Sequence, residues 1–311
     1  MAMLIDIRMP DWMTDKAVFD LLTPQLPGVQ LHCGAPETPL PDVKVLAANQ
    51  MFPGMAEMLP NLELVQKLGA GVETMVRDQN LPDNVRIARL EPVIQAVEIA
   101  EYCLAEVLAV LRNIRGYHLH QQARRWLGRE PRRAAETTIC VLGLGHIGAH
   151  VAAAFERNGF PTTGWSRSQK TIDGVECLIG PDGLKQGIGQ ADFVVSVLPS
   201  TPETRRMAND DFFASMKPGA ILINVGRGDL VVDNDLLAAL DKGQLGGAIL
   251  DVFNQEPLDS EHPFWSHELV AITPHVSGWS LGDGILDVAE NYKRLIAGQP
   301  LLREIDRTAG Y

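Results

Sequence analysis

Cysteine, basic residues and long apolar stretches are all scarce in this sequence of 311 residues. The few cysteines are far apart and form no CxxC pair, so we expect reduced thiols and neither a disulfide framework nor a metal site. They are Cys33, Cys103, Cys140 and Cys177. No stretch approaches the roughly 20 apolar residues of a membrane-spanning helix, because the best candidate, residues 99–111, contains Glu101 and Glu106. Asp6, Arg8 and Asp11 interrupt the apolar core that a secretory signal peptide would need.

Basic residues are also fewer than acidic residues in this sequence. The chain has 27 Lys and Arg against 39 Asp and Glu, a formal net charge of −12. This charge disfavours non-specific binding to nucleic acid or anionic membranes. The one basic cluster is interpreted as a solvated linker: Arg124, Arg125, Arg129, Arg132 and Arg133. We therefore expect a soluble cytoplasmic protein in which any anionic ligand is bound by local positive groups.

Short apolar runs alternate with longer helical patterns along the chain, as expected for parallel βαβ architecture. Predicted strands cover residues 3–7, 43–47, 64–67, 86–88, 138–142, 162–165, 193–197, 220–225, 247–252 and 270–273. Spacings of three and four predict one long helix over residues 94–117, and another follows at 283–297. The length predicts two domains, which we place at residues 1–98 with 286–311, and at 99–285.

A glycine-rich turn joins a predicted strand to a helix over residues 146–158. Gly143, Gly145 and Gly148 have the GxGxxG spacing, and Gly159 ends the helix. The first glycine permits the tight turn, the second admits a pyrophosphate, and the third lets helix and strand pack closely. The backbone N–H groups of such a turn bind anions. The pattern indicates a Rossmann dinucleotide-binding domain, although a purely structural turn is the simpler alternative.

The end of the next strand indicates which dinucleotide is preferred. An NAD site expects Asp or Glu about 20 residues beyond the glycines, at the end of the next strand, but after the predicted strand at residues 162–165 no carboxylate follows until Asp173. Arg167 lies at this point instead, between Ser166 and Ser168. A guanidinium can bind a 2′-phosphate with two hydrogen bonds. We predict NADP(H) as the preferred cofactor with NAD(H) possible; the alternative is an exposed turn residue at 167.

An arginine, a glutamate and a histidine each come just after a predicted strand. Arg227 follows residues 220–225, Glu256 follows 247–252, and His275 follows 270–273. The carboxyl ends of parallel strands are where open α/β sheets bind ligands. An arginine can bind a carboxylate or polarise a ketone oxygen, and an imidazole can protonate that oxygen. A glutamate beside the histidine would orient its ring. Each residue alone has a plain alternative as a solvated turn residue.

These motifs together resemble the D-isomer-specific 2-hydroxyacid dehydrogenase family, over essentially the whole chain. The resemblance lies in residues 143–148, 165–168, 198–204, 224–228, 250–258, 273–275 and 305–311. It implies a doubly wound Rossmann domain and a smaller flavodoxin-like substrate domain, both α/β with parallel sheets. It also implies homodimers formed through the cofactor domain, for which the apolar helix at residues 104–111 is the candidate.

The resemblance further assigns roles to particular residues. Arg227 would bind substrate, His275 would exchange the proton, and Glu256 would be its partner. Ala70 and Gly71 would hold the substrate carboxylate through backbone amides, a reading that their place between a strand and a helix supports. Other residues would contact the cofactor, with Asp251 at the nicotinamide carboxamide and Leu198 and Pro199 at the adenine. The remaining cofactor candidates are His146, Ile147, Trp165, Ser166, Ser168, Thr204, Val225, Gly226 and Gly278.

The predicted activity is therefore NADPH-dependent reduction of small 2-oxo acids to D-2-hydroxy acids, with glyoxylate and hydroxypyruvate as leading substrates. Trp279 departs from the small residues common in the family after the histidine, which bears on substrate preference. Two alternatives remain. A non-catalytic dinucleotide-sensing protein shares the fold, but the intact Arg227, Glu256 and His275 set disfavours it. A related formate dehydrogenase would typically carry Gln at position 256.

Overall fold

The computed structural model describes residues 1–8, 13–76, 78 and 81–307. Asp11 and residues 308–311, which entered the sequence argument, lie outside the described residues. The chain divides into two compact units, Met1–Gln95 with Trp279–Tyr311, and Ala96–Gly278. The predicted divisions at residues 98 and 286 differ from these limits. The second falls inside a helix over Gly284–Ile296, whereas the observed division precedes that helix.

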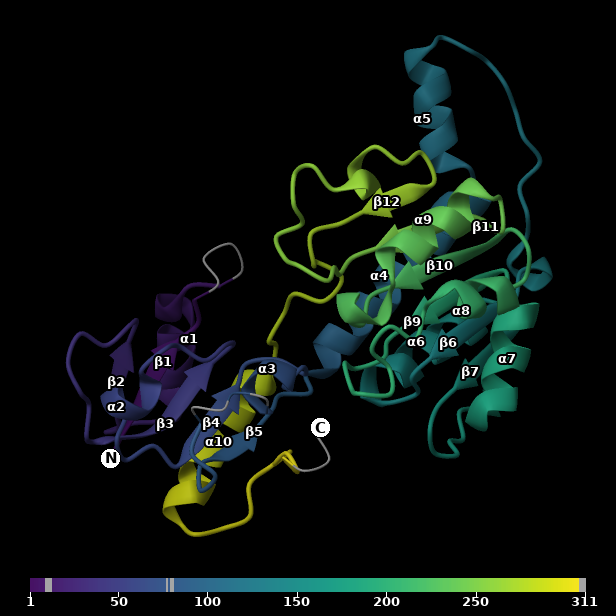
Figure 1. Ribbon diagram of the computed structural model, residues 1–311. Coiled ribbons are helices and arrows are strands. Elements are labelled where there is room, and N and C mark those ends of the chain that lie inside the picture. The colour runs from purple at the N-terminus through teal and green to yellow at the C-terminus, as the bar shows by residue number, and fades with distance from the viewer. Residues whose placement is uncertain (9–12, 77, 79–80, 308–311) are drawn as a thin grey trace. The chain divides into compact units, whose positions relative to one another are not determined.

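The first unit is built on a five-stranded parallel sheet with the strand order β2-β1-β3-β4-β5 (Figure 1). Its strands are β1 (Ala2–Asp6), β2 (Gln30–Cys33), β3 (Val43–Ala48), β4 (Leu64–Lys67) and β5 (Arg86–Ala88). Its helices are α1 (Asp15–Leu22), α2 (Met55–Met58), α3 (Glu73–Val76) and α10 (Gly284–Ile296), with a 3-10 turn at Thr23–Gln25.

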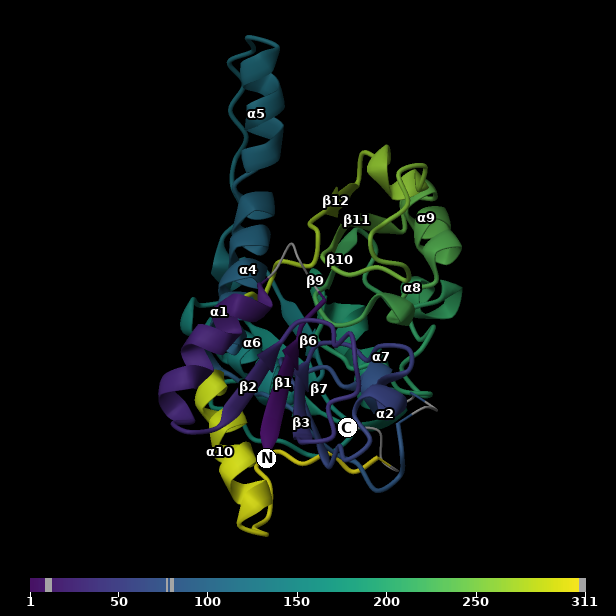
Figure 2. The same ribbon diagram turned by 90° about the vertical axis from the view of Figure 1, so that its left-hand side faces the viewer.

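Alternation along the strands gives this sheet two apolar faces. Met3 and Ile5 of β1 pack in one core with the buried sides of α1 and α10, which lie side by side in Figure 2. Ala2 and Leu4 belong to the opposite core, which includes Met55 of α2. The carboxyl-terminal helix α10 is therefore an integral part of the first unit.

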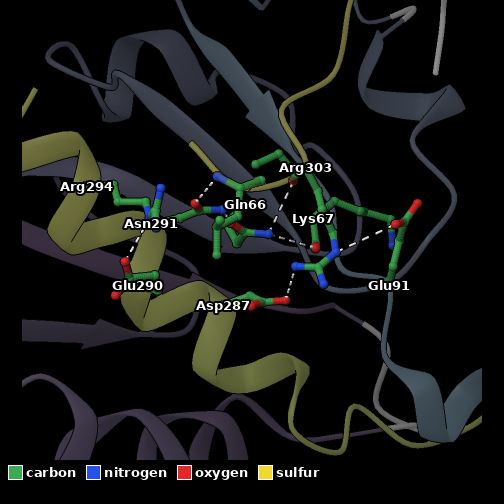
Figure 3. Close-up of polar contacts among 10 residues, drawn as sticks. Gln66, Lys67, Glu91, Asp287, Glu290, Asn291, Arg294 and Arg303 are labelled. Carbon is green, nitrogen blue, oxygen red and sulfur yellow. Dashed lines mark hydrogen bonds and ion pairs between the residues drawn. The ribbon is translucent and has the colours of Figure 1, made fainter. Parts of the chain in front are cut away.

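A buried amide pair fixes α10 to strand β4 of this sheet (Figure 3). The Nδ2 group of Asn291 donates to Oε1 of Gln66 at 2.8 Å and to the carbonyl of Leu302 at 3.0 Å. Asn291 Oδ1 accepts from the Leu302 amide at 2.7 Å. Both amide side chains are fully buried, so each needs these partners. The pair joins β4, α10 and the carboxyl-terminal segment in one polar network.

The second unit contains a seven-stranded parallel sheet of order β12-β11-β10-β9-β6-β7-β8. The strands are β6 (Ile139–Leu142), β7 (Thr162–Trp165), β8 (Glu176–Leu178), β9 (Phe193–Ser196), β10 (Ala220–Asn224), β11 (Leu245–Leu250) and β12 (Val270–Ile272). Successive strands run outward from β6 to β8, and the chain then returns to β9 on the other side of β6. This reversal is the switch point at which such sheets bind dinucleotides.

Helices cover both faces of the seven-stranded sheet. The helices in this part of the chain are α4 (Val93–Leu111), α5 (Ile114–Gln122), α6 (His146–Arg157), α7 (Gly180–Gln190), α8 (Asp210–Ser215) and α9 (Asp233–Asp241), with 3-10 turns at Ala134–Glu136, Gly228–Leu230 and Pro263–Trp265. Residues of α4 and α6 pack on one face, and residues of α7, α8 and α9 pack on the other. The predicted fold class, two parallel-sheet α/β domains of which one is a Rossmann domain, is confirmed.

Some local predictions were wrong. The single helix expected over residues 94–117 is two helices, because Asn113 adopts a left-handed φ of +53° between α4 and α5. Strands β2 and β8 were missed; both are short, lie at sheet edges and carry polar residues. Within the described parts of the chain, no helix is both long and apolar enough to cross a membrane.

Candidate active site

Three neighbouring strands of the second unit end beside one another, and each is followed by one of the residues singled out in the sequence. Arg227 lies three residues after β10, Glu256 lies in the segment after β11, and His275 follows β12. Strands β10 and β12 both pair in parallel with β11. The parallel register therefore delivers all three side chains to one edge of the sheet.

The histidine and the glutamate make a direct hydrogen bond. Nδ1 of His275 lies 2.7 Å from Oε2 of Glu256, and Oε1 of Glu256 accepts from the Phe253 amide at 2.9 Å. The side chains retain 48% and 36% of their solvent exposure. His275 itself has a φ of +56°, in the left-handed region that non-glycine residues seldom occupy. An unusual backbone conformation thus presents the imidazole to the carboxylate.

The charge state of Glu256 suits this pairing. Burial alone would raise the pKa of Glu256, but the hydrogen bond and charge of His275, the Phe253 amide and the charge of Arg227 together outweigh it. The pKa of Glu256 therefore lies below its ordinary value, so the carboxylate stays ionised at neutral pH. An ionised carboxylate beside Nδ1 accepts a hydrogen bond from the ring and so orients it. The contribution of Arg227 to this pKa also places its charge within reach of Glu256.

Two residues that the sequence argument missed shape the turn carrying Arg227. Asn224 is fully buried; its Nδ2 donates to the Arg227 carbonyl at 2.9 Å, and its Oδ1 accepts from the Gly226 amide at 3.2 Å. Gly228 packs so closely on the chain after β11 that an added Cβ would lie 1.9 Å from the carbonyl carbon of Phe253. Both residues lie inside the motif at 224–228. The Asn224 hydrogen bonds are local, whereas the contact of Gly228 with Phe253 cannot be predicted from the local sequence.

The glycine-rich turn has the geometry of an anion site. Gly143 has a φ of +95°, and a Cβ on Gly148 would lie 1.7 Å from the Gly143 carbonyl oxygen. A Cβ on Gly145 would meet open space, so an approaching group has room there. No side chain caps α6 at Gly145, which leaves the first-turn N–H groups of His146 and Ile147 directed outward. These features fit the pyrophosphate of a dinucleotide.

The turn after β7, at residues 165–168, exposes Arg167 and Ser168 to solvent. Trp165 Nε1 donates to the Gly180 carbonyl at 2.8 Å, and the buried Ser166 donates from Oγ to the Ser168 carbonyl at 2.8 Å. The pKa of the exposed Glu203 lies below its ordinary value because of hydrogen bonds to Thr201 and to its own backbone, with a further contribution from the Arg167 charge. Arg167 is thus near the loop at residues 198–204.

Several other residues predicted to bind the cofactor lie in the loop at residues 198–204 and at the end of β10. Leu198 is buried, and Pro199 is exposed beside it. Thr204 closes the loop, because its Oγ1 donates to the Pro199 carbonyl at 2.6 Å and accepts from the Thr201 amide at 2.8 Å. Val225 and Gly226 are buried at the end of β10, where a Cβ on Gly226 would lie 2.6 Å from the Leu198 carbonyl oxygen. Gly278 is the last residue of the second unit.

Asp251 is fully buried at the end of β11, with both carboxylate oxygens bonded inside the unit. Its Oδ1 accepts from Thr273 Oγ1 at 2.6 Å and from the Val276 amide at 2.9 Å, and its Oδ2 accepts from the Ser277 amide at 2.9 Å. These bonds fix the segment that carries His275. Contact with a nicotinamide carboxamide stays a prediction for this residue.

In the first unit, the predicted carboxylate-binding loop follows β4. Gly69 has a φ of +143°, and its carbonyl accepts from the Leu90 amide at 3.1 Å. The amides of Ala70 and Gly71 make no hydrogen bond to any described residue. Lys67, which the sequence argument passed over, donates to Asn49 Oδ1 at 2.7 Å, and its Nζ lies 3.4 Å from the position of a Cβ on Gly69. A positive charge therefore lies beside the loop.

The Rossmann sheet, its glycine turn and the Arg–Glu–His edge define the class of α/β dehydrogenases with a separate second domain. The family model described as D-isomer specific 2-hydroxyacid dehydrogenase, NAD binding domain, matches residues 104–277. A glyoxylate/hydroxypyruvate reductase A from Serratia proteamaculans is 40% identical over 264 residues, which cover 82% of this chain and 84% of that protein. The chain belongs to the D-isomer-specific 2-hydroxyacid dehydrogenase family.

Solved structures agree with this assignment. A family member from Xanthobacter autotrophicus Py2, in complex with NADPH and MES, is 34% identical with a TM-score of 0.91, over 100% of this chain and 99% of that one. An NADPH-dependent glyoxylate/hydroxypyruvate reductase from Sinorhizobium meliloti, in complex with NADP and sulfate, is 31% identical with a TM-score of 0.92 at the same coverage.

The close packing at Gly228 yields a test of how the site is assembled. Gly228→Ala should lower the free energy of unfolding by about 1–3 kcal/mol, because the new methyl group overlaps the Phe253 backbone and cannot be accommodated by a side-chain shift. Gly128→Ala is the matched control, since a Cβ there meets nothing within 4 Å. Urea denaturation measures both. Equal midpoints for the two variants would contradict the close approach of the two loops.

Proposed function

We propose that this protein reduces small 2-oxo acids to D-2-hydroxy acids with NADPH, with glyoxylate and hydroxypyruvate as the leading substrates. The observation that carries the proposal is the 2.7 Å hydrogen bond between His275 and Glu256, at the sheet edge that also holds Arg227. The names of the Serratia and Sinorhizobium relatives support the substrates, and the bound NADPH and NADP of the two solved relatives support the cofactor.

His275 acts as the proton donor in this proposal. Its Nδ1 is held by Glu256, so the other ring nitrogen, Nε2, gives the proton to the keto oxygen as that oxygen gains negative charge. Glu256 stabilises the cation before transfer and orients the ring throughout. Arg227 binds the substrate carboxylate and polarises the keto group. Bound NADPH supplies the hydride for the keto carbon, and His275 then regains its proton from solvent. The D-configuration follows from family membership.

Recognition of anions in the proposal relies on backbone amides and single cations. In the first unit, the amides of Ala70 and Gly71 are available to bind a substrate carboxylate. The amino end of α6 takes the pyrophosphate of the cofactor. Arg167 takes the 2′-phosphate that distinguishes NADP from NAD, since it is exposed and no carboxylate occupies this turn.

The activity is tested by following NADPH oxidation with glyoxylate, hydroxypyruvate, pyruvate and a bulkier 2-oxo acid. We expect turnover with the first two, and His275→Gln should lower kcat about 10²- to 10⁴-fold because the proton donor is lost. His267→Gln is the matched control, as His267 is a partly buried histidine that precedes β12 and has its Nε2 3.4 Å from Asp241 Oδ1. Retention of near-parental turnover in His275→Gln would remove the assigned role, and no turnover on the panel would remove the activity.

Cofactor choice is tested separately at Arg167. Arg167→Ala should reduce the preference for NADPH over NADH about 10- to 100-fold in kcat/KM, because a charge-assisted contact with the 2′-phosphate is lost while contacts common to both cofactors remain. Lys185→Ala, which removes an exposed positive charge on α7, is the control for a general electrostatic effect. An unchanged preference in Arg167→Ala would refute this assignment.

We also propose a homodimer. The exposed residues of α5 and of the segment after it are a better candidate for the interface than residues 104–111. Cys103, Val107 and Leu111 of α4 are buried in their own unit, so the stretch at residues 104–111 is only partly free. Further along, α5 extends away from the sheet of its unit (Figures 1 and 2). Four large apolar side chains on α5 and in the segment just after it are exposed: Ile114, Leu119, Trp126 and Leu127. Such a patch marks an interface.

Sedimentation equilibrium tests the dimer. The parent protein should sediment with twice the mass of one chain, and Leu119→Ser/Trp126→Ser should shift the equilibrium toward single chains, because the paired apolar area is reduced. Trp265→Ser provides the control, since Trp265 is an exposed tryptophan away from this patch. A parent protein with the mass of a single chain at micromolar concentration would contradict the proposal.

A further inference from the structure

A chain of hydrogen bonds behind the active-site histidine includes a residue that the proposed reaction does not use. Tyr102 lies on α4, and its hydroxyl is 2.7 Å from Oγ1 of Thr273. Thr273 Oγ1 in turn donates to Oδ1 of Asp251 at 2.6 Å. Asp251 is fully buried, while Tyr102 is half-buried against the core shared by α4 and α6. All three residues belong to the second unit.

The direction of these hydrogen bonds follows from the protons available. A hydroxyl carries one proton, and the Thr273 hydroxyl uses it in the hydrogen bond that it donates to Asp251. Thr273 Oγ1 can therefore only accept from Tyr102, whose hydroxyl must be the donor. The pKa of the Tyr102 hydroxyl lies above its ordinary value because burial disfavours the phenolate, with the nearby Asp251 charge acting in the same direction. The tyrosine thus remains protonated and able to donate across the neutral pH range.

The chain fixes the backbone on both sides of His275. On one side, Thr273 bonds to Asp251 through its hydroxyl and to the Leu250 carbonyl through its amide at 3.0 Å. On the other side, the amides of Val276 and Ser277 donate to the two oxygens of Asp251, each at 2.9 Å. The amide of His275 itself donates to the Asp251 carbonyl at 2.9 Å. These contacts hold His275 at its φ of +56°.

We propose that Tyr102 and Thr273 are positioning residues for the acid–base pair, acting through Asp251 to hold His275 where Nδ1 meets Glu256. The inference rests on the proposed function, and it adds a role for a residue on α4 that the proposed reaction does not otherwise use. A left-handed conformation at a non-glycine residue persists only where its surroundings impose it. Asp251, Thr273 and Tyr102 are those surroundings here.

The alternative is that Tyr102 and Thr273 contribute only packing. Three variants distinguish this packing role from the positioning role. Tyr102→Phe keeps the ring and removes the donor. Thr273→Val keeps the shape and removes the hydroxyl, whereas Thr273→Ser keeps the hydroxyl and removes a methyl group. Tyr117→Phe is the matched control, because the Tyr117 hydroxyl also makes hydrogen bonds, 2.9 Å from the Arg129 amide, but on α5 and away from this edge.

The kinetic test compares kcat and KM for glyoxylate reduction. We expect Tyr102→Phe and Thr273→Val each to lower kcat about fivefold or more, the effect of one lost hydrogen bond, with little change in the KM for NADPH. Thr273→Ser should retain most of the parental kcat, and the Tyr102→Phe/Thr273→Val double variant should be no worse than Thr273→Val, since both changes break one chain. Values of kcat within twofold of the parent in both single variants would overturn the proposal.

A second measurement does not depend on turnover. The pKa of Glu256 is held low partly by His275, so loosening His275 should return it toward its ordinary value. Carbon-13 NMR of the Glu256 carboxyl should show a higher titration midpoint in Tyr102→Phe and Thr273→Val than in the parent, Thr273→Ser and Tyr117→Phe. Unchanged midpoints would overturn the positioning role even if kcat falls. If the parent fails to reduce any 2-oxo acid, the proposed function fails and the midpoints still decide the positioning role.

Discussion

The hydrogen bond between Nδ1 of His275 and Oε2 of Glu256 depends on the parallel pairing of β11 and β12. Because the two strands end side by side, the side chains of Glu256 and His275, which are 19 positions apart along the chain, meet at 2.7 Å. The same pairing, continued to β10, brings the charge of Arg227 near enough to help lower the pKa of Glu256. Register, electrostatics and the proposed proton transfer are therefore consequences of one structural arrangement. A slip in register would separate the pair and expose Asp251, which is buried at the end of the same strand.

Local groups explain how a chain of net charge −12 can bind anions. The amino end of α6 lacks a side-chain cap, the amides of Ala70 and Gly71 make no bonds to described residues, and Arg167 and Arg227 add positive charge. These groups act at contact distance, whereas a diffuse surface charge is screened beyond about 8–10 Å at physiological salt. The net charge is informative about macromolecular partners and has little bearing on small anionic ligands.

Sequence patterns predicted those features that depend on neighbours along the chain. Apolar runs located the central strands, and the strand–glycine–helix order located the turn at Gly143. The position of Arg227, Glu256 and His275 after strands was sufficient to expect them at one edge. The edge strands β2 and β8 were not predicted, because the sequence of a short, partly polar strand resembles that of a loop. The roles of Gly228 and Tyr102 depend on contacts with distant segments, namely the Phe253 backbone and Thr273, which no local pattern encodes.

The central claim is that His275, held by Glu256, protonates a keto oxygen while Arg227 holds the carboxylate. A crystal structure with NADP and oxamate, an unreactive analogue of a 2-oxo acid, tests it most directly. We expect the oxamate carbonyl oxygen at about 2.6–3.2 Å from Nε2 of His275, with the oxamate carboxylate on Arg227 and the hydrogen bond between His275 and Glu256 intact. Oxamate bound with its carbonyl oxygen away from His275, or a His275 ring turned from Glu256 in that complex, would contradict it.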